Sequence, residues 1–329
     1  MDLSFTDDQL AVRDTIAKIC EKYDDEYWLS RDRDGEFPED FVKDLADGGW
    51  LGIAMPTEYG GSGLGITEAA LMMQTIAQSG AGFSGCSSMH INIFGPHPIV
   101  VHGTDEQKQR MLPPLIKGED RTCFGVTEPN AGLDTTRIET KAELQGDHYI
   151  VNGRKMWTST AQTATKIMLL ARTTPRDEAA KPTEGITLFY TDFDRDYCEA
   201  RVIEKMGRKA VDSNATFYDN LPVPVENRIG EEGRGFYYIL DGINPERILV
   251  AAEAVGLGRA ALRKAVAYAG ERVVFDRPIG KNQAIQHPLA DAWAHLEAAD
   301  AMVWRAASLY DAGQPCGAEA NAAKYLAAE

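Results

Sequence analysis

Two short segments carry residues whose types and spacing could hold a flat, polar ligand. In the first, Thr127 precedes a Pro/Asn/Gly turn that ends at Gly132, and in the second, Trp157 is followed by Thr158 and Ser159. A turn of this kind leaves backbone N–H groups and hydroxyls able to bind an anionic or carbonyl-rich group. The Trp157 indole can stack on a heterocycle while Thr127 and Ser159 hydrogen-bond its edge. Taken alone, both segments fit an ordinary β core equally well.

The elements that position these segments are expected to be β-strands. Apolar residues recur at about every second position from residue 121 to residue 233, and Gly146-Asp147 fits the turn of a hairpin. No helical pattern of useful length interrupts this part of the chain, which predicts a central all-β domain at 121–233. The expected strands are Thr122–Val126, Arg137–Gln145, Tyr149–Trp157, Lys166–Arg172, Gly185–Thr191, Arg201–Met206 and Ala215–Asn220.

Helical periodicity dominates on both sides of that domain. It predicts an N-terminal α-helical domain at 1–120 and a C-terminal helical bundle at 234–329. The Ala- and Leu-rich segment from Phe236 onward supports a helix of many turns. Pro245 in this segment predicts either a kink or a helix start that Asn244 caps. The fold class is therefore expected to be α+β and multidomain.

Length and charge limit the possible partners. The chain has 329 residues, enough for a large core or for several subdomains, and it carries a net charge of −16. This charge argues against a nucleic acid or an anionic membrane as a partner, because both would repel it. The sequence has no run of 18 apolar residues, and Met1-Asp2-Leu3-Ser4 does not begin a signal peptide. We therefore expect neither a membrane nor a nucleic acid as a partner.

The five cysteines are scattered along the chain, without a C-x-x-C pair and without a histidine at metal-ligand spacing. This pattern indicates reduced core thiols in a cytoplasmic protein, and no metal site. The residues are Cys20, Cys86, Cys123, Cys198 and Cys316.

The two candidate ligand segments also match a known signature. V-T-E-P-N-A-G-x-D at 126–134 and G-D-H-Y-I-V-N-G-R-K-M-W-T-S at 146–159 resemble the flavin-binding signature of the acyl-CoA dehydrogenases. The resemblance extends in order over essentially the whole chain. It implies an acyl-CoA dehydrogenase-like fold, with FAD in the cleft between the central β domain and the C-terminal bundle. That bundle is expected to be incomplete, because the chain ends before the family's final helices.

The resemblance also implies a reaction and a base. The family desaturates an acyl-CoA at Cα–Cβ, where a carboxylate removes the α-proton and flavin N5 accepts the β-hydride. In many members the base lies near the C-terminus, but in the isovaleryl-CoA and long-chain group it stands in a Glu-Arg-Leu-like setting on the long helix. Here Glu246-Arg247-Ile248 matches that setting, so Glu246 is the candidate base, with Asn244 and Arg247 as candidate substrate contacts. The alternative for Glu246 is a solvated residue in a first helical turn.

The cofactor contacts implied by the resemblance fall into two groups. The first group surrounds the two flavin segments and comprises Phe124, Val126, Thr127, Gly132, Leu133, Trp157, Thr158 and Ser159. The second group comprises Arg272 and Phe275 of an E-R-x-x-F motif and Gln283, which in the family contact the FAD of the neighbouring subunit. The resemblance therefore implies a homo-oligomer, a dimer or a dimer of dimers (a homotetramer). Without it, Arg272 would be an ordinary cation at a helix end.

Two residues depart from the family pattern. Leu133 stands where the family usually has Ser, which removes one hydroxyl contact. Asp276 replaces a common Gly and places a carboxylate close to the expected pyrophosphate, where like-charge repulsion would weaken FAD binding.

Three functions follow from these observations. The first is an FAD-dependent acyl-CoA dehydrogenase of fatty acid and lipid metabolism that passes electrons to an electron-transfer flavoprotein. The second is a superfamily acyl-CoA oxidase or flavin monooxygenase that uses O₂ directly. The third, favoured by Leu133 and Asp276, is a non-catalytic acyl-CoA-binding relative. The length and branching of the acyl chain stay open.

Overall fold

The computed structural model describes residues 5–329, so Met1-Asp2-Leu3-Ser4, in which we expect no signal peptide, lies outside the described residues. The described residues form two compact units, which we call the helical unit and the sheet unit. The helical unit contains residues up to Ser30, Leu64–Cys86 and Asn244–Glu329, and the sheet unit contains Arg31–Gly63 and Ser87–Ile243. Along the sequence the order of elements is helices, strands and helices, as expected.

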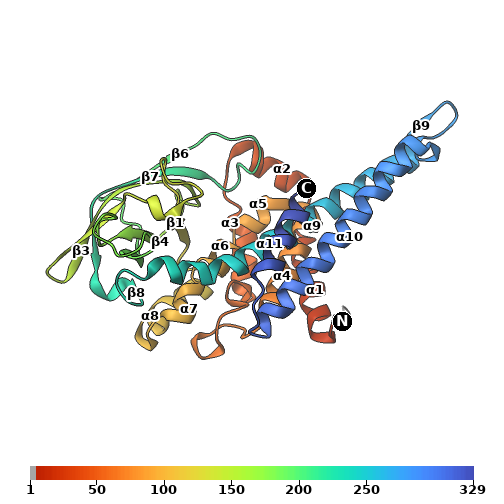
Figure 1. Cartoon of the computed structure of the whole chain (residues 1–329). Helices are drawn as coiled ribbons and strands as arrows, with labels where there is room; N and C mark the ends of the chain where they lie inside the picture. Colours follow the sequence, from red (N-terminus) through yellow and green to blue (C-terminus); the bar gives the residue numbers. More distant parts are fainter. Residues whose placement is uncertain (1–4) are drawn as a thin grey trace. The chain divides into compact units, whose positions relative to one another are not determined.

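Within residues 5–329, the sheet unit is built on an eight-stranded sheet. Seven of its strands follow in the order β6-β7-β3-β2-β4-β5-β8, and the eighth, β1, pairs parallel with β4. Figure 1 shows these strands in yellow and green. The predicted hairpin is confirmed, because β2 and β3 pair antiparallel across the two-residue turn Gly146-Asp147. The strands are β1 (Thr122–Gly125), β2 (Lys141–Gln145), β3 (His148–Ser159), β4 (Lys166–Arg172), β5 (Ile186–Asp192), β6 (Cys198–Val202), β7 (Ser213–Pro224) and β8 (Arg228–Ile229).

Both faces of β4 are buried. Ile167 and Leu169 point into one apolar cluster and Met168 and Leu170 into another, because successive side chains of a strand alternate between its faces. The second cluster also contains residues of helix α8 (Asp105–Ile116), which covers that face. Several strand boundaries differ from expectation. The largest differences are at β2, which begins at Lys141 and not at Arg137, at β6, which spans Cys198–Val202 and not Arg201–Met206, and at β7, which continues to Pro224 and not only to Asn220.

The N-terminal half contains short helices. The Thr6 side chain caps the first of them in a capping box with Gln9, and Thr104 caps α8 in the same way. The helices are α1 (Asp7–Cys20), α2 (Asp25–Asp34), α3 (Glu39–Asp47), α4 (Ile66–Ile76), α5 (Gly82–Ser87), α6 (Ile91–Phe94) and α7 (His97–His102). A π-helical turn, Ala77–Ala81, directly follows α4.

Three helices follow the sheet: α9 (Gly235–Glu271), which belongs to the helical unit from Asn244 onward, α10 (Gln283–Asp311) and α11 (Gly317–Ala328). Of the two alternatives for Pro245, a helix start at Asn244 is wrong, because α9 begins at Gly235 and continues through Pro245. The Asn244 side chain accepts a hydrogen bond from Arg247 at 3.3 Å instead of capping a helix. Among residues 5–329, no helix is both long enough and apolar enough to cross a lipid bilayer.

The N-terminus of α4 is capped from a remote part of the sequence. Its N-cap residue, Gly65, has no side chain to offer. The Asp311 carboxylate at the end of α10 instead accepts hydrogen bonds from the N–H groups of Ile66 and Thr67, at 2.8 and 2.9 Å. A carboxylate is favourable there because it faces the positive end of the helix dipole.

A polar cluster joins α4, α9 and α10 inside the helical unit. The Arg259 guanidinium donates to the carboxylates of Glu297 and Asp300 at 2.8 and 2.9 Å. The Gln74 amide donates to the other oxygen of Asp300 at 2.6 Å. Because Asp300 and Gln74 are buried, these bonds satisfy polar groups that water cannot reach.

Candidate active site

A β-bulge brings the two candidate ligand segments together. The register between β3 and β7 shifts once between Val151 and Gly153, and it shifts again after Lys155, so that Met156 and Trp157 oppose a single residue. Trp157 adopts a left-handed φ of 63° in this bulge. The Met156 N–H leaves the β7 ladder and donates to the Thr127 carbonyl at 2.8 Å. The second segment is therefore hydrogen-bonded directly to the first.

The bulge also turns the Trp157 side chain outward. Its exposed fraction is 59%, although it lies in a strand whose neighbouring positions Lys155 and Thr158 are fully buried. The interpretation of Trp157 as ordinary β core is therefore wrong. An exposed indole next to the half-buried Thr127 offers one flat apolar face and one hydroxyl, which fits a flavin ring.

A buried ion pair lies under the two segments. Lys155 Nζ is 2.8 Å from Glu128 Oε1 and donates to the Val126 carbonyl at 3.1 Å. Burial raises the pKa of Glu128, but the charge and the hydrogen bond of Lys155 outweigh this effect and hold that pKa below its usual value. Burial lowers the pKa of Lys155 to about 8. Glu128 thus has a structural role.

Sequence reasoning did not single out Lys155, although a signal was present. Tyr149 and Val151 lie on the inward-facing side of β3, and Lys155 follows them at even spacing. A lysine in such a register is a candidate for a buried charge that needs a partner. Glu128, in the nearby turn, is that partner.

The other predicted residues of the first group lie around these two segments in different environments. Phe124 and Val126 are half-buried and pack against a core cluster of the sheet unit. Gly132 and Leu133 are exposed, and the Leu133 side chain is as open to solvent as an isolated residue. The Thr158 hydroxyl lies 3.3 Å from the Thr216 hydroxyl inside the core and the residue is fully buried, so its side chain is not available to a ligand.

The candidate base lies in the interior of a long helix. Glu246 is half-buried and stands about three turns after the start of α9. The alternative that it is a solvated residue of a first helical turn is therefore wrong. Arg247, which follows it, is held by its hydrogen bond to Asn244.

The second group of predicted residues lies at the far end of the two long helices, where Figure 1 shows β9. Arg272 follows α9 directly, and strands β9 (Val273–Val274) and β10 (Arg277–Pro278) pair across the turn Phe275-Asp276. Both turn residues have positive φ, 50° and 57°, as in a type I′ hairpin turn. Asp tolerates this conformation better than most residues, which explains how Asp276 can replace a glycine. Phe275 is 93% exposed, and Gln283 begins α10.

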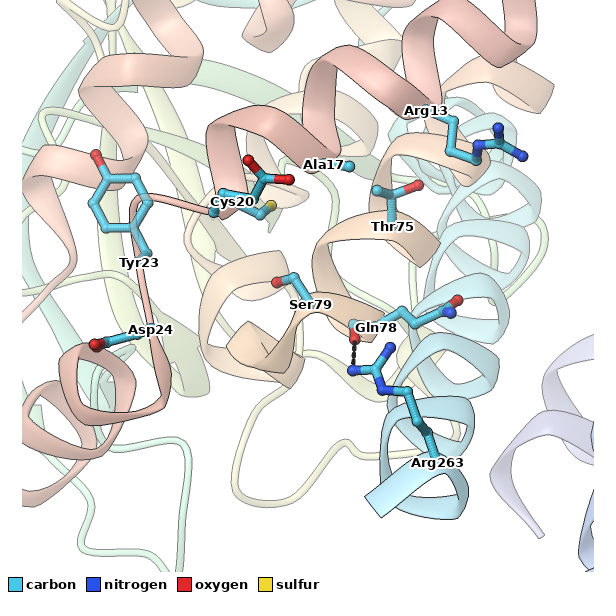
Figure 2. A pocket seen from close by; sticks show the side chains of 10 residues that line it. Arg13, Ala17, Cys20, Tyr23, Asp24, Thr75, Gln78, Ser79 and Arg263 are labelled. Atoms are coloured by element: carbon cyan, nitrogen blue, oxygen red, sulfur yellow. Dashed lines mark hydrogen bonds between the residues drawn. The ribbon is translucent and has the colours of Figure 1, made fainter. Parts of the chain in front are cut away.

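A separate hollow of about 440 Å³ lies in the helical unit. Figure 2 shows side chains from α1, α4, the π-helical turn and α9 around it, with Arg263 donating to the Gln78 carbonyl. None of the predicted site residues lines it. Among residues 5–329 no group of histidine, cysteine and acidic side chains could hold a metal ion. In the same range all five cysteines are buried and unpaired, so the expected core thiols are confirmed.

Comparison with known proteins identifies the family. The descriptions "Acyl-CoA dehydrogenase, N-terminal domain", "middle domain" and "C-terminal domain" match residues 6–119, 123–221 and 233–329 in that order. A 3-(aryl)acrylate reductase of Clostridium sporogenes is 38% identical over 299 residues, which is 91% of this chain and 78% of that protein. The chain belongs to the acyl-CoA dehydrogenase family.

Solved structures of the acyl-CoA dehydrogenase fold agree. The butyryl-CoA dehydrogenase of Megasphaera elsdenii superposes with a TM-score of 0.93 at 31% identity, covering 99% of this chain and 85% of that one. A chain in a structure of the electron transferring flavoprotein of Acidaminococcus fermentans superposes with a TM-score of 0.94 at 32% identity and the same coverage. The predicted fold class is confirmed, with helical N- and C-terminal domains and a central β domain. So are the FAD cofactor and the oxidoreductase activity on acyl-CoA thioesters.

Proposed function

We propose that Glu246 is the base that removes the α-proton when this protein desaturates an acyl-CoA thioester between Cα and Cβ. The supporting observation is that Glu246 is half-buried in the interior of α9, in the Glu-Arg setting of the isovaleryl-CoA and long-chain group. A base on a continuous helix is fixed in direction, as removal of the α-proton requires. When bound, FAD supplies the acceptor for the β-hydrogen, which leaves as hydride.

The protein's own groups have distinct roles in this proposal. Trp157 contacts one face of the flavin, and the hydroxyls of Thr127 and Ser159 bind its polar edge. Asn244 and Arg247, already hydrogen-bonded to each other, contact the substrate. Leu133 presents an apolar side chain where a hydroxyl is usual in the family. One polar contact to the ligand is therefore lost, at a side chain that is fully exposed.

The decisive experiment follows the flavin absorbance of the purified protein without oxygen. We expect bound FAD, bleaching by at least one member of a panel of acyl-CoA thioesters of different length and branching, and slow recovery in air. An aryl-substituted propionyl-CoA joins the panel because the Clostridium sporogenes relative is named for 3-(aryl)acrylates. Fast recovery in air would indicate the oxidase or monooxygenase instead. A protein that takes up no FAD would indicate the non-catalytic relative.

The same experiment identifies the electron acceptor. We propose an electron-transfer flavoprotein, supported by the superposition on a chain from the Acidaminococcus fermentans structure. Faster reoxidation on addition of purified electron-transfer flavoprotein than in air would support this assignment. We further propose that the reaction belongs to fatty acid metabolism. We place the protein in the cytoplasm, because five buried, unpaired thiols suit a reducing compartment. Recovery of the protein in a membrane or extracellular fraction would contradict this location.

We also propose a homodimer or a dimer of dimers. Arg272 and the exposed Phe275 stand at the end of two long helices, where a second copy can place its FAD against them. An arginine there can bind a pyrophosphate through two charge-assisted hydrogen bonds. We expect Arg272→Ala to lose FAD while Lys281→Ala, which removes an exposed cation from the same turn region, keeps it. Sedimentation of the parent as a flavin-loaded monomer at micromolar concentration would rule out the assembly.

A further inference from the structure

A fully buried lysine beside the flavin segments calls for an explanation. The Lys155 side chain is 0% exposed, and lysines are almost never buried to this degree unless they are paired. A buried ion pair is weak evidence for stability as such, because apolar side chains of similar volume often stabilise a core as well or better. The structure therefore suggests that the pair performs a task that apolar residues could not.

The contacts of the pair define that task. Lys155 belongs to β3, and it donates both to Glu128 in the turn and to the Val126 carbonyl at the start of the first segment. Glu128 in turn accepts the N–H groups of Glu139 and Thr140, at 2.6 and 3.0 Å, just before β2 begins. Three pieces of chain that are separate in sequence thus meet at one pair of charges.

The pair also stands directly before the bulge. A left-handed conformation is costly for a bulky residue such as Trp157, so it persists only where its surroundings fix it. Lys155 is anchored inside the core before the bulge, and Thr158 is anchored after it by Thr216 and by the Asn214 amide on its carbonyl. Between these two anchors, the Met156 N–H is bound to Thr127. With both ends held inward, the Trp157 indole can only project outward.

We propose that Lys155 is a positioning residue, which through Glu128 and Val126 holds the bulge against the Thr127 segment and so presents Trp157 and Thr127 together to the flavin. The inference rests on the proposed function only in placing FAD at these segments. The hydrogen bonds that join Lys155, Glu128, Val126, Met156 and Thr127 are present in the structure and do not depend on the proposed function. In this proposal Lys155 contacts neither the substrate nor the flavin and acts only through the two segments that it joins.

The test compares two double variants that remove one ion pair each from the same sheet. Glu128→Gln/Lys155→Met removes both charges and keeps the shapes, so that no unpaired charge is left buried. Lys166→Met/Asp192→Asn is the matched control, because it removes the β4–β5 pair, which touches neither flavin segment. Glu128→Gln alone is a milder second variant. Burial lowers the pKa of Lys155, and loss of the Glu128 charge lowers this pKa further, so that the amine can lose its proton and stay buried without a charge.

Two measurements separate the possible results. We expect the first double variant to bind FAD about tenfold or more weaker than the parent, with the control unchanged. In the FAD-free protein, we expect amide exchange of Met156 to accelerate about tenfold or more, because its bond to Thr127 opens. Unchanged FAD affinity and unchanged exchange in a folded variant overturn the proposal. If the parent binds no FAD but Met156 still exchanges faster in the first double variant than in the parent, the positioning of the segments is supported and the proposed cofactor site is refuted.

Discussion

Glu246→Gln is expected to slow reduction of the bound flavin by an acyl-CoA by about three orders of magnitude, equivalent to about 4 kcal/mol in the activation barrier. The α-proton of a thioester is weakly acidic, so the base has to be close and fixed in direction. Glutamine keeps the size of the side chain in the interior of α9 and cannot accept the proton. FAD binding, acyl-CoA binding and thermal stability should change little, because no cavity is created.

The measurement is a rapid-mixing experiment without oxygen, using the acyl-CoA that bleaches the parent fastest. Glu271→Gln is the control, since it makes the same change at an exposed position at the end of the same helix. A Glu246→Gln protein that bleaches at nearly the parent rate would show that another residue is the base. Loss of FAD from Glu246→Gln would instead point to a structural role for this side chain.

Arg259→Leu should lower the free energy of unfolding by about 3 kcal/mol, the order expected when one partner of a buried ion pair is removed. The arginine is one quarter exposed and bonds to Asp300, whose side chain is only 13% exposed. Without Arg259, the Asp300 carboxylate keeps the Gln74 amide but loses the nearby positive charge. Because the three residues come from α4, α9 and α10, the loss should loosen the whole helical unit.

Urea unfolding, followed by circular dichroism, measures this effect. Arg305→Leu is the control, because its ion pair with Glu319 is more exposed and is expected to contribute less than about 1 kcal/mol. Adding Asp300→Leu to Arg259→Leu should restore part of the stability by removing the uncompensated charge. Equal unfolding midpoints for Arg259→Leu and the parent would show that Asp300 finds enough compensation in Gln74 or water.

The sequence predicted best those elements whose signal is local. The bounds of β4 were predicted correctly, because a continuous apolar run buried on both faces is unambiguous. Helix α2 was missed, because in Asp25–Asp34 only Trp28 is buried and no apolar stripe appears. Strand β2 starts late because Glu128 holds the backbone at Glu139 and Thr140, a contact that spacing in the sequence does not reveal.

The same distinction applies to the candidate site. Residue types singled out the Thr127 and Trp157 segments, and the family resemblance favoured a ligand site over an ordinary β core. The bulge that exposes Trp157, and the buried Lys155 beneath it, depend on pairing between β3 and β7 and on the turn at Glu128. Pro245 disfavours a helix interior and therefore left open a kink or a helix start at Asn244, yet tertiary packing carried α9 through this position.

The cap of α4 also bears on the order in which the chain can fold during its synthesis. Ile66 emerges from the ribosome early, but Asp311, which caps it, is translated 245 residues later. Every segment of the sheet unit has been made once Ile243 is in place, whereas the helical unit still lacks Asn244–Glu329. Because domains generally fold as units as they emerge, the sheet unit can fold first. Until the long helices arrive, α1 and α4 keep apolar faces exposed, and a nascent chain stalled near residue 243 should therefore be a strong chaperone substrate.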